Sequence, residues 1–231
     1  HPLEQFRPLS PGAAGEGSVR TALSRMVAAG EAIRGPDGSY ALAGALVERQ
    51  RRQDASRAAV RSEWSGTWRQ AVVDAGARSA GDRAMLRRAM QRLRMGELRD
   101  GVWLRPDNLD PGRLPEDRAV VDGQARWFVS HPDDDGDLAA ALWDLDAWAS
   151  RATVLRREMA ALGGPLVAGG ADALARGSPL AEAELRHFNA DPLLPVELRP
   201  RRWPGDSLRG DYERYDRAYR SVLAGWLAAS V

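Results

Sequence analysis

Cysteine and lysine are both missing from this chain of 231 residues, and all 33 of its basic residues are arginines. Without cysteine the chain has no disulfide, no zinc site with thiolate ligands and no thiol nucleophile. Without lysine it has neither a Walker A phosphate loop nor a Schiff-base amine. It also has no apolar run of about 18 residues, the length of a membrane-spanning helix, and no secretion signal. We therefore expect a protein that has no membrane segment and that resides in the cytoplasm.

Histidine is scarce as well, and no catalytic motif accompanies it. The three histidines are His1, His131 and His187, and neither internal one lies in a recognisable catalytic pattern. No Gly-x-Ser-x-Gly nucleophile elbow occurs, and the paired glycines at 163–164 and 169–170 do not match the dinucleotide-binding fingerprint. The sequence therefore predicts neither an enzyme nor a bound cofactor.

Charge is distributed unevenly, although the formal net charge is only +1. Residues 61–105 hold 10 arginines against 5 acidic residues, whereas residues 106–150 hold 3 against 11. A basic first half and an acidic middle suit a protein that presents its N-terminal side to a polyanion such as DNA.

An amphipathic helix is expected from Ser18, a good N-cap, to Gly30, a good C-terminal stop. Its apolar residues recur at helical spacing and form one stripe, made of Val19, Ala22, Leu23, Met26 and Val27. Its other face carries hydroxyls and guanidiniums, the groups that reach base edges and phosphates: Arg20, Thr21, Ser24 and Arg25. An ordinary surface helix with a solvated polar face has the same pattern, so both interpretations stay open at this point.

A β-hairpin is expected directly after this helix. Ile33 precedes the turn signal Pro36-Asp37-Gly38, and Tyr40 and Leu42 then alternate with period two. A short helix followed by a hairpin is the layout of a winged helix-turn-helix, in which Arg34 and Ser39 of the wing would touch the DNA backbone or minor groove. Residues 1–17 leave no room for a further helix, so the first helix of such a domain is expected to be missing.

A second domain is expected over residues 57–132, with the first assigned to residues 1–56. The pattern indicates a strand at Ala71–Val73 and then a helix over 81–95, which has Leu86, Met90 and Leu93 on one face. Strands near 97–99 and 102–105, a short helix after Pro111 and a strand over 126–130 are expected to follow. This order, β-α-β-β-α-β, indicates a ferredoxin-like domain.

Residues 133–231 are expected to form a mainly helical third domain. A run of aspartates, Asp133 to Asp137, does not fit a calcium loop because His131 and Leu142 would occupy ligand positions. We interpret it as the acidic N-terminus of a helix that continues to about Leu162.

The remainder of that domain is punctuated by glycine and proline. Gly163-Gly164-Pro165 is expected to end the long helix, and residues 182–188 are expected to form a short one. Four prolines between residues 191 and 205 exclude an α-helix there. The last helix, from Asp206, is expected to place aromatic and apolar residues on one face: Tyr212, Tyr215, Tyr219, Val222, Leu223 and Trp226.

Three blocks of this sequence resemble the PaaX family of bacterial transcriptional repressors. The first is the helix segment 18–26, which is similar to the recognition helix of that family. The second consists of Trp64, Gly66 and Trp68 with the six consecutive residues Gly101-Val102-Trp103-Leu104-Arg105-Pro106. The third consists of Asp191, Leu194, Pro195, Leu198, Pro200, Trp203, Pro204 and Gly205.

The resemblance implies an α+β protein with an N-terminal winged helix-turn-helix, a central ferredoxin-like domain and a helical C-terminal domain. It implies a repressor that binds operator DNA as a homodimer and that an aryl-CoA thioester such as phenylacetyl-CoA releases, which controls aromatic-acid catabolism. The expected DNA-binding residues are Ser18, Arg20, Thr21, Ser24, Arg25, Arg34 and Ser39.

An effector pocket between the central and C-terminal domains would need aromatic walls and arginines for the CoA phosphates. The residues available for it are Trp64, Trp103, Arg105, Arg201, Arg202 and Trp203. Packing between domains is the alternative role of these tryptophans. Two alternative functions also stay open: an assembly protein whose winged helix no longer binds DNA, and a PaaX-like regulator of an unrelated pathway with a different effector.

Overall fold

The computed structural model of the chain describes residues 24, 27, 32–34, 40–42, 63–76, 78–168 and 171–229. The chain divides into two compact units. One, the helical unit, consists of residues 1–52, 151–186 and 204–231, and the other, the sheet unit, consists of residues 53–150 and 187–203. The three consecutive domains expected from the sequence, with boundaries after residues 56 and 132, stay a prediction.

The expected hairpin is present as two short strands, β1 (Ala32–Arg34) and β2 (Tyr40–Leu42). They pair antiparallel, with Ile33 opposite Ala41 and Arg34 opposite Tyr40. From the expected helix that precedes them, Ser24 and Val27 are helical and exposed. The other residues of that helix lie outside the described residues.

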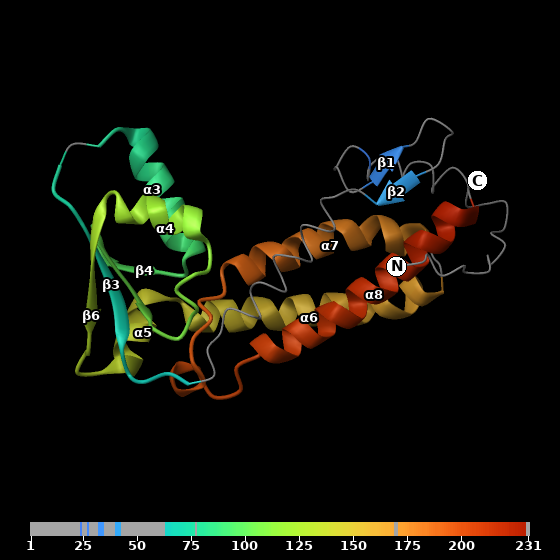
Figure 1. Cartoon of the computed structure of the whole chain (residues 1–231). Coiled ribbons are helices and arrows are strands. Elements are labelled where there is room, and N and C mark those ends of the chain that lie inside the picture. The colour runs from blue at the N-terminus through green and yellow to red at the C-terminus, as the bar shows by residue number, and fades with distance from the viewer. Residues whose placement is uncertain are drawn as a thin grey trace. The chain divides into compact units, whose positions relative to one another are not determined.

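The sheet unit is built on a four-stranded antiparallel sheet with the strand order β4-β5-β3-β6. Its elements follow one another as β3 (Trp68–Val73), α3 (Ala80–Arg92), β4 (Gly96–Arg99), β5 (Val102–Pro106), α4 (Pro115–Asp122) and β6 (Ala125–Ser130) (Figure 1). This is the ferredoxin-like order that the sequence predicts. The tight turn from β4 to β5 depends on Gly101, whose φ of 76° a side chain would disfavour.

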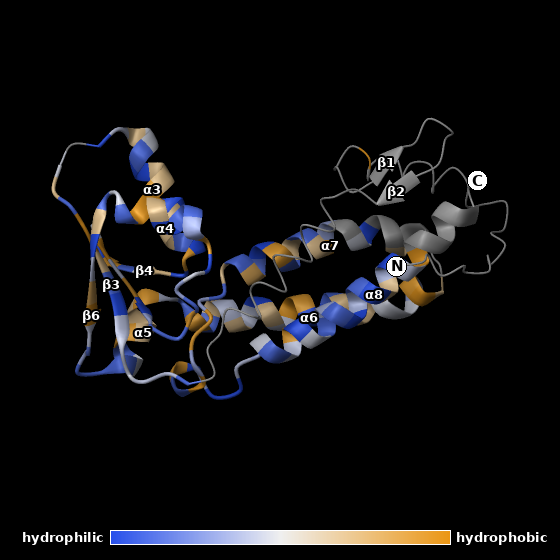
Figure 2. Ribbon diagram, viewed as in Figure 1, coloured by the Kyte–Doolittle hydropathy of each residue, from blue (hydrophilic) through white to orange (hydrophobic). Residues whose placement is uncertain are grey.

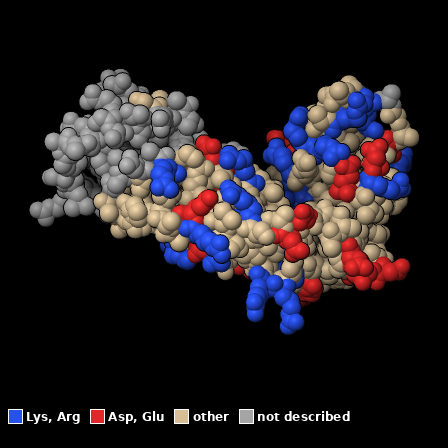
Figure 3. Space-filling view, turned by 180° about the vertical axis from the view of Figure 1, so that it is seen from behind, with Lys and Arg blue, Asp and Glu red and all other residues tan. Residues whose placement is uncertain are grey.

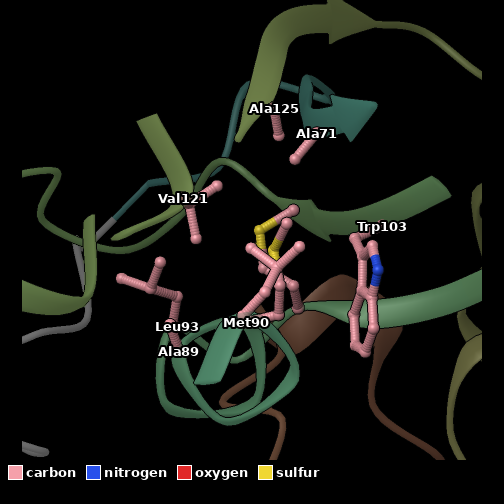
Figure 4. Packing of buried hydrophobic residues seen from close by; sticks show 9 residues of the cluster. Ala71, Ala89, Met90, Leu93, Trp103, Val121 and Ala125 are labelled. Atoms are coloured by element: carbon pink, nitrogen blue, oxygen red, sulfur yellow. The ribbon is translucent and has the colours of Figure 1, made fainter. Parts of the chain in front are cut away.

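Helices α3 and α4 cover one face of this sheet. Met90 of α3 is fully buried and points toward Trp103 of β5 and Val121 of α4, as Figure 4 shows. Leu86, Met90 and Leu93, which the spacing places on one helical face, all belong to this core. Truncating one such large side chain to alanine typically costs about 2–5 kcal/mol, so this cluster determines how α3 sits on the sheet.

The other face of the sheet is covered by α5 (Asp135–Leu142) and by the returning segment around Leu194. The Asp134 carboxylate caps α5 by accepting the amide of Asp137 at 2.8 Å, so the interpretation of the aspartate run as a helix N-terminus is confirmed. A Cβ at Gly96 would lie 2.7 Å from the Cβ of Leu142. Glycine at this position therefore lets α5 approach strand β4 closely.

The single helix expected from the aspartate run to about Leu162 begins where the sequence predicts, but it is wrong in its continuity and in its end. Trp143 is extended, with φ −138° and ψ 137°, and this residue separates α5 from α6 (Leu145–Val167). Helix α6 then continues through Pro165, because the missing amide of a proline in the last turn costs only one hydrogen bond while Leu166 is fully buried. The short helix expected at 182–188 is the end of the longer α7 (Ala171–Asn189).

The proline-rich segment after α7 is largely extended, as predicted, with one 3₁₀ turn, η1 (Val196–Leu198). The buried Asp191 carboxylate accepts the amide of Leu193 at 2.8 Å, and this places Leu193 at a φ of 55°. The carbonyl of Leu193 in turn accepts a hydrogen bond from Asn108 Nδ2 at 2.7 Å. These bonds fasten the segment to the sheet unit.

The helical unit contains most of α6 and α7 together with α8 (Gly205–Ala229). Each of these helices carries both hydrophilic and hydrophobic residues along its length (Figure 2). Tyr212, Tyr215 and Tyr219 of α8, which the sequence places on one helical face, are buried. Gly177 of α7 packs against them, since a Cβ there would lie 2.6 Å from the Tyr215 hydroxyl. Among the described residues, no helix combines the length and the apolar character needed to cross a membrane.

Candidate functional site

The expected DNA-binding surface falls largely outside the described residues. Ser24 is exposed on its helical turn, and Arg34 ends strand β1 opposite Tyr40. Five further residues of the expected surface lie outside the described part of the chain: Ser18, Arg20, Thr21, Arg25 and Ser39. The DNA-contacting role of all seven stays a prediction.

Trp103 and Arg105, two of the expected effector residues, lie on one face of β5. The Trp103 indole belongs to the core beneath α3, and the guanidinium of Arg87 lies 5.3 Å from its ring centre. Arg105 is only 7% exposed, and its Nη1 donates to the carbonyl of Pro106 at 3.0 Å.

The environment of Arg105 is both buried and electropositive. Burial lowers the pKa of Arg105 to about 10, and the nearby Asp107 carboxylate opposes this effect. Three arginines lower the pKa further: Arg113, Arg69 and Arg118. Arg105 still carries its charge at neutral pH, because a pKa of about 10 lies well above 7.

Trp64 lies with the core on the opposite face of the sheet. Its Nε1 donates to the carbonyl of Thr67 at 2.7 Å, and its ring meets Trp68 edge to face at 6.3 Å. Trp68 is fully buried and donates from Nε1 to Asp135 Oδ1 at 2.7 Å, which ties β3 to α5. Trp64 and Trp103 therefore belong to two different hydrophobic clusters.

Trp203 belongs to a third aromatic group, in which it stacks on Trp148. The ring centres of Trp148 and Trp203 are 4.4 Å apart, and those of Trp148 and His187 are 4.3 Å apart. Arg201 and Arg202, which precede Trp203, are exposed. The six expected effector residues thus lie in separate environments, and their role in effector binding stays a prediction.

Two features of the helical unit were not anticipated from the sequence. One is a groove between α6 and α8 that carries the arginines Arg156, Arg157 and Arg214. The other is Glu184, whose carboxylate is fully buried and accepts no hydrogen bond from any described residue. Spacing along the chain contains no signal for either feature, because both depend on how α6, α7 and α8 pack against one another.

The family of the chain follows from its central region. The model of the PaaX protein central Cas2-like domain matches residues 61–130, which span the whole four-stranded sheet. The chain belongs to the PaaX family.

A solved structure is similar to the chain over nearly its full length. The uncharacterized protein Rv0674 from Mycobacterium tuberculosis is 37% identical, with 94% of this chain and 85% of that chain covered and a TM-score of 0.67. No curated protein matches the sequence. In this PaaX-family chain, the signature residues Val102–Pro106 are all buried in β5, and Asp191 and Leu194 anchor the returning segment. Those parts of the signature therefore build the sheet unit.

No group of three or more potential metal ligands occurs among the described residues. Two of the aspartates at 133–137 serve instead as helix-capping and indole-binding groups. Asp134 caps α5, and Asp135 accepts the hydrogen bond of Trp68.

Proposed function

We propose that the chain is a non-enzymatic transcriptional repressor that binds operator DNA as a homodimer. Its membership of the PaaX family is the single observation that carries this proposal. The exposed Ser24 and the antiparallel pair β1–β2, which follows it at the spacing of a wing, agree with it. Arg20, Thr21, Ser24 and Arg25 would enter the major groove, and Arg34 and Ser39 would contact the backbone or the minor groove.

The effector proposed for the repressor is an aryl-CoA thioester such as phenylacetyl-CoA, whose binding would release the DNA and so switch on aromatic-acid catabolism. This part of the proposal rests on the family alone. Trp64, Trp103, Arg105, Arg201, Arg202 and Trp203 are its candidate contacts.

A mobility-shift experiment with the promoter region of the protein's own gene tests both the DNA binding and the release by the effector. We expect a specific shift that disappears on addition of phenylacetyl-CoA but not of free coenzyme A. A shift that is indifferent to the thioester would contradict the effector, and the absence of any specific shift would contradict the repressor.

The salt dependence of the shift separates DNA binding from assembly. Binding through several phosphates releases counterions, so the affinity falls steeply as salt rises, by roughly 10³ or more between low and moderate salt for six or more contacts. An assembly formed through an apolar surface would not weaken in this way.

Substitution of the recognition arginines tests the DNA-binding surface itself. Arg20→Ala and Arg25→Ala should each weaken specific binding by roughly 1–3 kcal/mol if the side chain contacts a base. Arg217→Ala, which removes an exposed arginine of α8 far along the chain, is the matched control. Unchanged operator affinity in both recognition-helix variants would refute the assignment.

A further inference from the structure

A groove of about 660 Å³ runs between α6 and α8 within the helical unit. This volume lies in the range of small-molecule pockets, which is about 300–1,000 Å³. Buried side chains of both helices contribute to its wall, namely Met159 and Tyr215, together with Ala218. Gly163 also lines the groove, and a Cβ there would meet no atom within 4 Å, so the space in front of it is open.

Three guanidiniums stand along this groove: those of Arg156, Arg157 and Arg214. Asp211 is the one acidic residue among those that line it. Its carboxylate accepts Arg156 Nε at 2.5 Å on one oxygen and Arg214 on the other. One carboxylate thus holds two arginines in place and neutralises only one charge.

The positive charge that Asp211 does not neutralise stays within the groove. Arg157 is exposed and forms no ion pair with the described residues, so the groove keeps an excess of two positive charges beside an apolar wall. On the face of the molecule in Figure 3, basic and acidic side chains lie interspersed. Arginines that are preorganised by a neighbouring carboxylate lose little entropy on binding an anion, and guanidinium groups bind phosphate and carboxylate through paired hydrogen bonds.

We propose that the groove between α6 and α8 binds a small amphipathic anion, with an apolar body against Met159 and Tyr215 and a phosphate or carboxylate at Arg157 and Arg214. The apolar wall favours such a ligand over an inorganic ion, which would gain nothing from it. The positive charge favours it over a neutral apolar molecule. This site is distinct from the proposed effector contacts, because none of those six residues lines the groove.

Calorimetric titration of the full chain, without DNA, tests the proposal with two probes of equal chain length. The probes are n-octyl phosphate and the neutral n-octyl glucoside, each below its micelle concentration. We expect octyl phosphate to bind at one site at least about tenfold more tightly than octyl glucoside, since charge-assisted hydrogen bonds form only with the phosphate. Equal affinities, or no saturable binding of octyl phosphate, would overturn the proposal.

Two glycines locate the site. Gly163→Leu would project a side chain into the groove and should abolish octyl phosphate binding. Gly164→Leu is the matched control: its Cβ also meets nothing within 4 Å, it lies on the same helix, and it does not line the groove. Leucine favours a helix over glycine, so both variants should keep their fold, which circular dichroism verifies. Binding that survives in Gly163→Leu as in Gly164→Leu would place the ligand elsewhere and refute the proposal.

The arginines are tested by selectivity. Arg157→Gln combined with Arg214→Gln should weaken octyl phosphate by at least about tenfold and leave octyl glucoside unchanged. A purely structural role of these arginines would alter both probes alike. An unchanged preference for octyl phosphate in the double variant would overturn their assignment as anion contacts.

Discussion

Replacement of the buried Glu184 by glutamine should stabilise the protein, and by an amount that grows with pH. Glu184 is fully buried in the helical unit, and both carboxylate oxygens lack hydrogen-bond partners within the described part of the chain. Burial raises the pKa of Glu184 from 4.5 to about 8. Arg151 of α6 opposes this effect, whereas Glu158 of α6 and Asp211 of α8 add to it.

The magnitude follows from linkage. The folded state holds a proton on Glu184 up to about pH 8, whereas the unfolded chain releases it near pH 4.5, so the free energy of unfolding falls as pH rises through this window. Each pH unit corresponds to about 1.4 kcal/mol. Holding Glu184 protonated at pH 7 therefore costs up to about 3 kcal/mol of stability. Glutamine has nearly the same shape and remains neutral, so it removes this cost.

Urea unfolding followed by far-UV circular dichroism, at about pH 5 and about pH 8, measures the effect. We expect Glu184→Gln and the parent protein to be similar at the lower pH and to diverge at the higher one. Glu182→Gln, an exposed change on the same helix that removes a surface ion pair with Arg186, should change stability by less than about 1 kcal/mol at either pH. If the difference between Glu184→Gln and the parent is the same at both pH values, Glu184 is not a buried carboxyl that is held protonated.

Two further changes probe the packing of each unit. Gly177→Ala should lower the free energy of unfolding by about 1–3 kcal/mol, because the new methyl group would lie 2.6 Å from Tyr215 and Tyr219. Thermal unfolding measures this loss of stability. An unchanged melting temperature would show that α7 and α8 do not pack closely there. Trp148→Ala should lower the free energy of unfolding by about 3–5 kcal/mol, since the indole stacks on both His187 and Trp203. Trp148→Phe should lower it clearly less. Equal losses in urea unfolding would contradict a stacking role.

The sheet unit could be predicted from the sequence because its signals are local. Gly101 demands a turn, Leu86 and Met90 share a helical face, and short apolar runs such as Ala71–Val73 mark the strands. The β-α-β-β-α-β order follows from these signals, and the structure confirms it. The resemblance to the family could be seen for the same reason, since its motifs are short stretches of chain such as Gly101–Pro106.

Helix boundaries after residue 133 could not be read in this way. Leu142-Trp143-Asp144-Leu145 contains no helix breaker, yet Trp143 leaves the helix to stack on Trp68, 6.4 Å away between ring centres, and Asp144 caps the next helix at the Ala147 amide. Gly163-Gly164-Pro165 has the opposite outcome, because the burial of Leu166 outweighs three residues that disfavour a helix. Tertiary contacts decided both boundaries.

The same contrast between local signals and tertiary contacts applies to the candidate sites. The expected DNA-binding residues follow from one helix and one hairpin that are adjacent in sequence. The groove, by contrast, joins Arg156 to Asp211 across 55 residues, through a helix packing that no periodicity specifies. The six expected effector residues were selected by type, and side-chain type alone does not determine which face of the sheet each one occupies.

The interleaving of the two units has a consequence for the order in which the chain acquires its structure during synthesis. The sheet unit lacks the Leu193–Leu194 part of its core until these residues have left the ribosome, and the helical unit lacks all of α8 until still later. Glu184, Gly177 and the apolar side of α6 are therefore not yet packed against α8 when most of the chain has already been synthesised. A nascent chain arrested before residue 204 would expose this unfinished surface to chaperones and proteases, so premature termination late in the message should be almost as damaging as termination early in it.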